Sequence, residues 1–298
     1  MANLPPWLIL DPQLQSWLAE DIGRGDRTTQ ALWPASADAD SSPLGQAELR
    51  LKQTGVIAGL PLFQRVFRLL SRQVQIKPLV NEGDWCPPGT VVAQLEGSLS
   101  VLLMGERVAL NLIMHLSGIA TLTRTYADQI ADLPTQLVDT RKTTPGLRIL
   151  QKYATQVGGA VNHRLGLDDA VMIKDNHIVA AGGIGPAIRL VREQSPFPLA
   201  IEVETETLAQ VQEALDAQAD IIMLDNMSIE QMQQAVKMIR QPSPGETGYR
   251  AKIEASGNIT LQTIRAVAET GVDYISTSAT ITQASWLDFS LRFTPPLG

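Results

Sequence analysis

The sequence contains little cysteine, few aromatic residues and no excess of positive charge, and each shortage excludes a class of protein. Cys86 is the only cysteine among 298 residues, so the chain can form neither an intramolecular disulfide nor a cysteine-based metal cluster. A lone, reduced cysteine is typical of a cytoplasmic protein. Lysine and arginine number 24 against 31 acidic residues, aromatic residues make up 5%, and the net charge is -7. Nucleic-acid binding is not expected, because it calls for a basic surface with interleaved aromatic residues.

Long apolar runs are also missing. The apolar stretch near the N-terminus, residues 4–10, is flanked by prolines and has no basic residue before Arg24, so it predicts neither a signal peptide nor a membrane anchor. The most apolar later stretch, residues 108–122, is interrupted by Asn111, His115 and Gly118 and is too short to span a bilayer. We therefore expect no membrane association.

The second half of the chain repeats one pattern, a short apolar run followed by polar or charged residues. Each run is typical of a buried strand, and segments with helical periodicity lie between most of them. Such β-α units carry their chemistry at the carboxyl ends of the strands, as in α/β barrels. About seven strands, rather than eight, predict an incomplete barrel. The predicted strands are residues 136–138, 160–161, 170–173, 199–201, 221–224, 253 and 274–275, and the clearest helices are 208–217, 229–239 and 260–270.

The first half of the chain is typical of a smaller α+β domain, and the length of the chain suffices for both parts. Two stretches rich in small residues and proline, 34–45 and 242–248, predict surface loops. The predicted helices are 12–21, 61–71 and 104–120, and the predicted strands are 47–51, 74–80 and 91–95.

Cationic residues follow the first three strands of the predicted barrel. A guanidinium group binds carboxylate or phosphate through paired hydrogen bonds, and lysine adds a point charge. In an acidic chain this group predicts a substrate that carries several anionic groups. Its members are Arg141, Lys142, His163, Arg164 and Lys174.

Acidic residues belong to the next two strands. Strand alternation places Glu202 and Glu204 on one face, with only Glu204 at the rim, and Asp225 follows the next strand. Carboxylates at neighbouring strand ends fit a magnesium ion held jointly with substrate phosphates. The loops that begin at Ser256 and Ser276 follow the last two strands, where barrels often bind phosphate through backbone N–H groups.

Structural roles compete with these functional ones. Glu202 and Glu254 fit a buried ion pair with a lysine as well as they fit catalysis. The residues Arg148 and Lys152, one helical turn apart, predict a solvated helix face. His115 is expected to pack against a helix, His177 either to cap a loop or to support the site, and Arg107 either to pair with Glu106 or to act in the site.

Taken together, the motifs resemble the quinolinate phosphoribosyltransferase family over nearly the whole chain. The resemblance begins at Glu20-Asp21-Ile22-Gly23. It continues through Glu106-Arg107, His115-Leu116-Ser117-Gly118, Asp139-Thr140-Arg141-Lys142-Thr143, Asn162-His163-Arg164, Lys174-Asp175-Asn176-His177, Glu202-Val203-Glu204, Asp225-Asn226 and Glu254-Ala255-Ser256-Gly257-Asn258.

The resemblance implies an open-faced sandwich domain, residues 1–116 with the tail 285–298, joined to an incomplete barrel, residues 117–284. It implies transfer of the phosphoribosyl group of phosphoribosyl pyrophosphate to quinolinate with decarboxylation, a step of NAD synthesis. It also implies a Mg2+ cofactor and a homodimer or hexamer.

The resemblance assigns roles residue by residue. Arg141, His163, Arg164 and Lys174 would bind the carboxylates of quinolinate, and Thr140 would be a further substrate-binding residue. Lys142 would act near the reacting centre, and Arg107 would enter the site of the neighbouring subunit. Glu204 and Asp225 would hold the metal and the ribose. The 5′-phosphate would lie against Ser256, Gly257, Asn258, Ser276 and Ser278, although many relatives have glycine at the positions of Asn258 and Ser278.

Three other functions fit parts of the pattern. A Schiff-base aldolase would use Lys142 or Lys174 at a strand end. A phosphoribosyltransferase for another base, such as the molybdenum-associated relatives, would keep the phosphate side and change the carboxylate-binding residues. A non-enzymatic binder of organic anions would have no use for Glu204 and Asp225.

Overall fold

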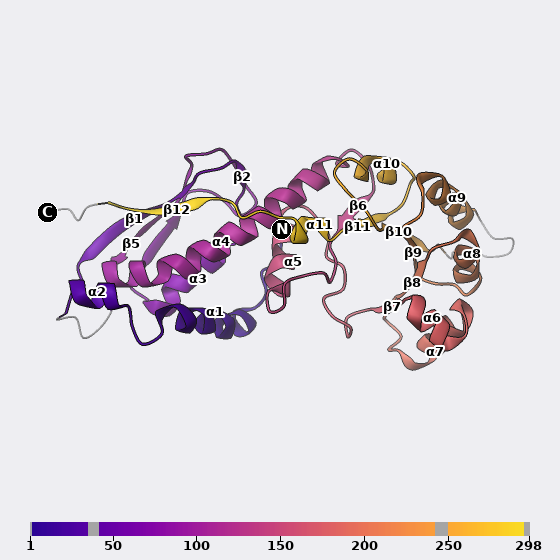
Figure 1. Cartoon of the computed structure of the whole chain (residues 1–298), viewed down its shortest axis with the longest axis horizontal. Coiled ribbons are helices and arrows are strands. Elements are labelled where there is room, and N and C mark those ends of the chain that lie inside the picture. Colours follow the sequence, from indigo (N-terminus) through magenta and orange to yellow (C-terminus); the bar gives the residue numbers. More distant parts are fainter. Residues whose placement is uncertain (1, 35–41, 242–249, 295–298) are drawn as a thin grey trace. The chain divides into compact units, whose positions relative to one another are not determined.

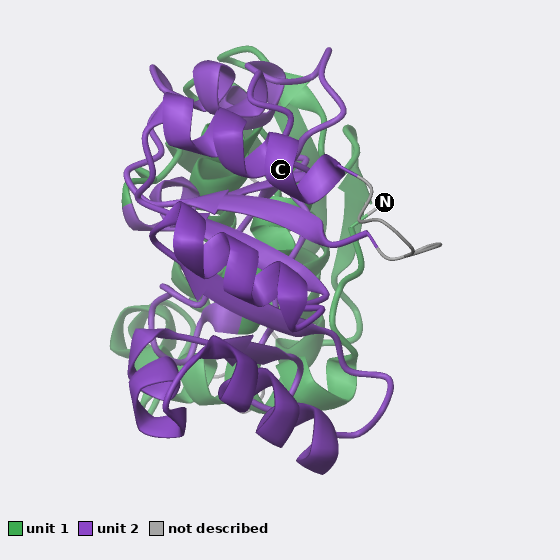
Figure 2. Ribbon diagram, turned by 90° about the vertical axis from the view of Figure 1, so that its right-hand side faces the viewer, with its two compact units in different colours: residues 1–124, 149–158, 283–298 green, residues 125–148, 159–282 purple. Residues whose placement is uncertain are grey.

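The computed structural model describes residues 2–34, 42–241 and 250–294, and the chain divides into two compact units (Figure 2). Unit 1 comprises residues 1–124, 149–158 and 283–298, and unit 2 comprises residues 125–148 and 159–282. The predicted domains, 1–116 with 285–298 and 117–284, stay a prediction. The segment 149–158, which lies in unit 1, falls inside the second of them.

Unit 1 contains a four-stranded antiparallel sheet in the order β12-β1-β5-β3. Its edge strand β12 comes from the end of the chain and lies beside β1 (Figure 1). The sheet strands are β1 (Leu44–Leu51), β3 (Gln75–Pro78), β5 (Val91–Ser98) and β12 (Phe289–Thr294), and a second, two-stranded sheet contains β2 (Gly55–Val56) and β4 (Trp85–Cys86). The helices are α1 (Trp7–Ile22), α2 (Arg27–Leu32), α3 (Leu60–Leu70) and α5 (Arg148–Val157), with α4 (Leu99–Asp128) continuing into unit 2.

Helix α4 is longer than the sequence predicts. It extends beyond the predicted range 104–120 at both ends. Gly118 lies inside it and permits close contact: a Cβ atom there would lie 2.0 Å from the carbonyl oxygen of Ser285. By length and composition α4 could cross a membrane, contrary to the prediction that its apolar stretch is too short. However, 56% of its most apolar window is buried, as in the core helix of a folded domain.

Unit 2 contains a six-stranded parallel sheet in the order β6-β11-β10-β9-β8-β7. Its strand interiors are buried and mostly apolar, and Val203, Ile222 and Ile253 have no exposed surface. The buried acids Glu202 on β8 and Glu254 on β10 are the exceptions. The strands are β6 (Gln136–Val138), β7 (Val171–Ile173), β8 (Ile201–Thr205), β9 (Ile221–Asp225), β10 (Lys252–Ser256) and β11 (Tyr274–Ser276).

The strand predicted at Ala160–Val161 is only a single parallel bridge between Val138 and Val161. Pairing ends there because Asp139 accepts hydrogen bonds from Asn162 and from the backbone of His163, which turns the chain away from β6. The sheet therefore has six strands and one bridge, close to the seven predicted strands.

Helices cover the outside of this sheet (Figure 1). Two of them begin at capping boxes, in which Thr207 and Ser228 accept from the backbone N–H groups of Gln210 and Gln231. The helices are α6 (Asp175–Ala181), α7 (Ile184–Gln194), α8 (Leu208–Asp216), α9 (Ile229–Arg240), α10 (Ile264–Ala268) and α11 (Ala279–Thr282). The predicted loop 242–248, and residues 35–41 of the predicted loop 34–45, lie outside the described residues, whereas Leu44 and Gly45 belong to β1.

Candidate active site

The carboxyl edge of the unit 2 sheet collects the predicted site residues. The parallel pairing of the strands brings their carboxyl ends to one edge, where α/β folds place their ligands. Arg141 and Lys142 follow β6, His163 and Arg164 follow the bridge at Val161, and Lys174 follows β7. Glu204 and Asp225 end β8 and β9, and Ser256 and Ser276 end β10 and β11.

His163 is held between two buried carboxylates. Its Nε2 atom lies 3.1 Å from Glu202 Oε2 and 3.5 Å from Glu254 Oε2. The other ring nitrogen, Nδ1, accepts a hydrogen bond of 2.7 Å from the backbone N–H of Arg164. The expected ion pair with a lysine is not what these contacts show: both carboxylates face His163, whose ring is uncharged because Nδ1 accepts a hydrogen bond.

Glu254 is the carboxylate most affected by this arrangement. Burial and, next, the negative charge of Glu202 raise its pKa to about 7, while His163, Ser276 and Lys174 act in the opposite direction. Glu202 and Glu254 also each have an Oε1 atom that is buried without a hydrogen-bond partner within the described structure. Such incompletely satisfied acids in a strand-end cluster are typical of functional sites.

Arg141 and Arg164 form the cationic side of the site. Burial and the charge of Arg141 lower the pKa of Arg164, and Glu202 opposes this effect. Arg164 Nη1 donates to the carbonyl oxygen of Ala170 at 2.9 Å, which fixes the side chain. Two guanidinium groups that repel each other are stabilised by a bound anion, so this pair favours a carboxylate or phosphate ligand.

Lys174 joins the cationic and acidic sides, because its ammonium group forms an ion pair with Glu204. The backbone N–H of Lys174 donates to His177 Nδ1 at 3.0 Å, so His177 caps the start of α6. Lys142 is exposed, and its backbone N–H donates to the Thr140 hydroxyl at 3.0 Å.

Oxygen ligands for a divalent cation are present at the rim. Glu204 and Asp225 lie on neighbouring strands and are half-buried, and such carboxylates fit magnesium, which takes few protein ligands when it binds together with phosphates. A second group of possible ligands, His163, Glu202 and Glu254, lies within 4.8 Å of one another deeper in the unit. Its histidine nitrogen and its burial make it less suited to magnesium than the rim.

The turns after β9 and β10 have an unusual backbone. Asn226, Gly257 and Asn258 adopt the left-handed region with φ of 55°, 93° and 53°. A Cβ atom on Gly257 would lie 2.2 Å from Asn226 Oδ1, so only glycine fits there without a shift. Asn258 Nδ2 donates to Asn226 Oδ1 at 3.1 Å. Asparagine tolerates this region best after glycine, so Asn258 fits this backbone.

The structure also decides the predictions for Arg148, Lys152 and His115. Lys152 is 1% exposed and Arg148 is half-buried, so these residues are not a solvated face. Arg148 instead donates to Thr143 Oγ1 at 3.1 Å and to the carbonyl oxygen of Leu165 at 3.0 Å, tying together two loops of unit 2. His115 packs on Trp286 with ring centroids 5.7 Å apart, as expected of a packing histidine.

Sequence reasoning missed the role of Asp139, which is fully buried and fixes the turn that carries Asn162 and His163. A signal was present, since an aspartate directly after a buried strand must find partners nearby. Arg107 is exposed on α4 in unit 1, and its predicted entry into a neighbouring subunit's site stays a prediction.

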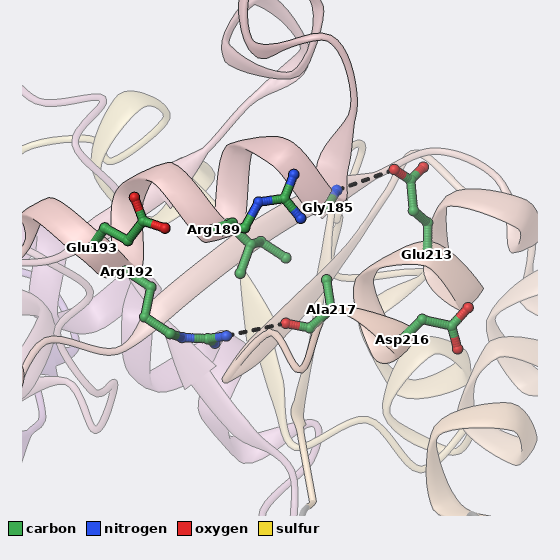
Figure 3. A pocket seen from close by; sticks show the side chains of 8 residues that line it. Gly185, Arg189, Arg192, Glu193, Glu213, Asp216 and Ala217 are labelled. Atoms are coloured by element: carbon green, nitrogen blue, oxygen red, sulfur yellow. Dashed lines mark hydrogen bonds between the residues drawn. The ribbon is translucent and has the colours of Figure 1, made fainter.

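A surface pocket of about 570 Å³ lies elsewhere, between α7 and α8 (Figure 3). Its charged side chains complete helix ends: Glu213 accepts from the backbone N–H of Gly185 at 3.1 Å, and Arg192 donates to the carbonyl oxygen of Ala217 at 3.3 Å. None of its lining residues follows a strand, so we assign it no role in the chemistry.

Comparisons with known proteins agree with the motifs. Residues 26–117 match the model of the quinolinate phosphoribosyl transferase N-terminal domain, and residues 119–292 match that of its C-terminal domain. A probable nicotinate-nucleotide pyrophosphorylase (carboxylating) of Synechocystis sp. is 57% identical over 98% of this chain and 95% of its own length. The corresponding Bacillus subtilis protein is 42% identical over 96% of this chain and 94% of its own length.

Solved structures show the same fold. The structure of NadC from Streptococcus pyogenes covers 98% of this chain and 100% of its own, with a TM-score of 0.89 and 41% identity. The nicotinate-nucleotide pyrophosphorylase from Francisella tularensis covers 99% of both chains, with a TM-score of 0.89 and 35% identity. The chain therefore belongs to the quinolinate phosphoribosyltransferase family.

Proposed function

We propose that this chain transfers the phosphoribosyl group of phosphoribosyl pyrophosphate to quinolinate and releases one carboxylate as carbon dioxide. The products are nicotinate mononucleotide and pyrophosphate, in the de novo synthesis of NAD. The observation that carries the proposal is the collection of Arg141, Arg164 and Lys174 at one strand edge, beside two carboxylates, in a chain of this family. We place the enzyme in the cytoplasm.

Quinolinate carries two carboxylates and so needs several cations. We assign its binding to Thr140, Arg141, His163, Arg164 and Lys174. The guanidinium groups can each make paired hydrogen bonds with a carboxylate. Both ring nitrogens of His163 are engaged by protein groups, so His163 contributes the shape of this pocket and not a charge.

The phosphoribosyl side lies against the other strand ends. We assign Glu204 and Asp225 to Mg2+ and the ribose hydroxyl groups, and the 5′-phosphate to Ser256, Gly257, Asn258, Ser276 and Ser278. Magnesium, when bound, supplies positive charge that stabilises the leaving pyrophosphate. The ion pair of Lys174 with Glu204 links the two halves of the site, because one partner is assigned to each substrate.

The reaction needs positioning more than proton transfer. The bond from ribose C1 to pyrophosphate breaks, and pyrophosphate leaves with the electron pair. The quinolinate nitrogen attacks C1, and the resulting pyridinium ring accepts the electrons of the carboxylate bond as carbon dioxide leaves. The ring carbon then takes up a proton. Lys142, exposed at the rim, is placed to balance charge near the reacting centre, and alignment and electrostatics supply the rate enhancement.

We also propose that the active assembly is a homodimer or hexamer in which Arg107 serves the site of the neighbouring subunit. Its exposure on α4 supports this assignment. Mixing inactive Arg107→Ala and Lys142→Ala proteins should then restore activity, because a mixed dimer contains one site with both residues intact. Mixtures that stay inactive would place Arg107 in its own subunit's site or outside any site.

The rival functions lack comparable support. An aldolase needs a free lysine amine, whereas Lys174 forms an ion pair with Glu204. For Lys142, borohydride trapping with a carbonyl substrate tests the aldolase function, and we expect no trapped adduct. A binder of organic anions has no use for Glu204 and Asp225. A transferase for another base would not need the cations assigned to the second carboxylate.

The test is a coupled assay of the purified protein with quinolinate, phosphoribosyl pyrophosphate and magnesium. We expect nicotinate mononucleotide and carbon dioxide to form at equal rates, and a chelator to abolish both. Product from nicotinate but none from quinolinate would refute the substrate assignment and leave the phosphate side in place.

A further inference from the structure

In the cluster of His163, Glu202 and Glu254, the proposed function assigns a role to His163 but none to the two carboxylates. Both carboxylates are almost completely buried, at 2% and 3% exposure, on strands β8 and β10. Burying two acids side by side is costly unless each gains partners. Their shared partner is a single imidazole, and each keeps one oxygen without a hydrogen bond among the described residues.

The imidazole has only one orientation that satisfies its neighbours. The backbone N–H of Arg164 donates to Nδ1, so the proton of the ring lies on Nε2, which faces the two carboxylates. The backbone N–H of His163 donates to Asp139 at 2.9 Å, which fixes the chain at the same point. Rotation of the ring would therefore break contacts on both of its sides.

The two acids lie on different strands, Glu202 on β8 and Glu254 on β10. Burial and the charge of Glu202 raise the pKa of Glu254 to about 7. Ser276, at the end of β11, lies close enough to the Glu254 side chain to lower its pKa. Glu254 thus connects the histidine turn to a strand end that we assign to the phosphate.

We propose that Glu254 is a positioning residue of the quinolinate pocket, which acts by holding the His163 ring and, through the backbone bond to its Nδ1 atom, the adjacent Arg164. This inference rests on the proposed function, because it assumes that Arg164 and His163 bind quinolinate. It assigns to Glu254 a contact with a substrate-binding residue and not with substrate.

Two substitutions of Glu254 distinguish the effect of its size and hydrogen bonding from the effect of its negative charge. Glu254→Gln keeps the size and hydrogen-bonding capacity of the protonated acid, whereas Glu254→Ala removes the support of the ring. We expect Glu254→Ala to raise the KM for quinolinate about tenfold or more. The Nε2 atom of His163 would keep only the Glu202 carboxylate, so the ring would lose its support on the β10 side. The KM for phosphoribosyl pyrophosphate should change by less than about twofold, and Glu254→Gln should restore the quinolinate KM to within about threefold.

Asp273→Asn provides the matched control. Asp273 accepts from the backbone of Ile253, the neighbour of Glu254, at 2.8 Å and pairs with Arg240, but it lies at the amino end of the strands. Its replacement should lower stability without changing the quinolinate KM. A rise of both KM values in Glu254→Ala, or an equal quinolinate KM in Glu254→Ala and wild type, would overturn the proposal.

The histidine itself gives a second readout that does not depend on activity. The chain has three histidines, His115, His163 and His177, so their ring nitrogens can be followed separately by 15N NMR. We expect the wild-type His163 Nδ1 resonance to be that of a hydrogen-bond acceptor, and Glu254→Ala to shift only the His163 signals. Unchanged His163 signals would overturn the proposal, as would a stoichiometric transition metal in the purified protein that is lost in Glu254→Ala. Failure of the wild type to turn over quinolinate would instead refute the proposed function, whatever the NMR result.

Discussion

Burial raises the pKa of two carboxylates, Glu82 in unit 1, which is half-buried, and Glu254 in unit 2, which is almost completely buried, but the protein surrounds them differently. Glu82 accepts hydrogen bonds from the backbone N–H groups of Gly59 and Leu60, at 2.5 and 3.0 Å, and from the Tyr153 hydroxyl at 2.7 Å. It therefore completes the start of α3. Glu254 has one buried oxygen without a partner in the described residues and a second acid beside it.

The difference separates an acid used for stability from an acid used for function. Burial raises the pKa of both, but at Glu82 three donors counteract it, whereas at Glu254 the charge of Glu202 adds to it. A fully satisfied polar group lowers the energy of the fold, and an incompletely satisfied one is retained where chemistry needs it. Substitutions in the two units should therefore change different quantities.

The largest effect is expected for Arg141→Ala in unit 2. Removing a guanidinium group that pairs with a carboxylate of quinolinate should lower kcat/KM for quinolinate by about 100- to 1,000-fold. The free energy of unfolding should change by less than about 0.5 kcal/mol, because the repulsion of Arg164 is relieved at the same time. Steady-state kinetics measure kcat/KM, and urea unfolding measures the free energy of unfolding. Arg192→Ala is the control: it loses hydrogen bonds to the end of α8, so it should lower stability and leave kcat/KM unchanged.

Glu82→Ala in unit 1 should show a loss of stability instead. It leaves two backbone donors and a tyrosine hydroxyl without their acceptor, so we expect about 2–3 kcal/mol less free energy of unfolding in urea. Both KM values should stay unchanged. Glu82→Gln keeps one acceptor oxygen, so its free energy of unfolding should fall by less than that of Glu82→Ala. A large rise in either KM with unaltered stability would show that the comparison between the two units is wrong.

The sequence predicted the strand edge better than it predicted the contacts made there. Apolar runs that end in polar residues located β6, β9 and β11 within about one residue, because a buried parallel strand leaves a strong local pattern. Alternation also placed Glu202 inside and Glu204 at the rim, as their burial confirms. These features depend on residues that are close in the chain.

Contacts between distant residues left no such pattern. Nothing near Lys152 indicates that it is buried, and nothing near Glu254 indicates that its partner is His163, 91 positions earlier. The helix predicted at 104–120 is likewise longer in the structure, Leu99–Asp128, and its Gly118, a poor helix former by propensity, accommodates the chain at Ser285. Tertiary packing decides such positions.

Gly257→Ala tests whether the turn after β10 is built for a ligand. At φ 93° and with a Cβ atom 2.2 Å from Asn226 Oδ1, alanine must displace the turn, and we expect the KM for phosphoribosyl pyrophosphate to rise about tenfold. Gly89 in unit 1 is the matched control, since its φ is 88° and a Cβ atom there would meet nothing within 4 Å. Gly89→Ala should cost about 1 kcal/mol of stability and leave both KM values unchanged. If the two substitutions changed the KM for phosphoribosyl pyrophosphate equally, the turn after β10 would not be part of the phosphate pocket.

Asn258→Gly should have the smallest effect. Glycine relieves the strain of φ 53° but loses the 3.1 Å hydrogen bond to Asn226 and makes the unfolded chain more flexible. These contributions oppose one another, so the free energy of unfolding should change by less than about 0.5 kcal/mol, and the KM for phosphoribosyl pyrophosphate by less than about twofold. Urea unfolding and steady-state kinetics on the same preparation measure both. A KM that rises severalfold at unchanged stability would mean that the Asn258 amide itself contacts the phosphate, so that this chain has replaced a backbone contact of the glycine-containing relatives with a side-chain contact.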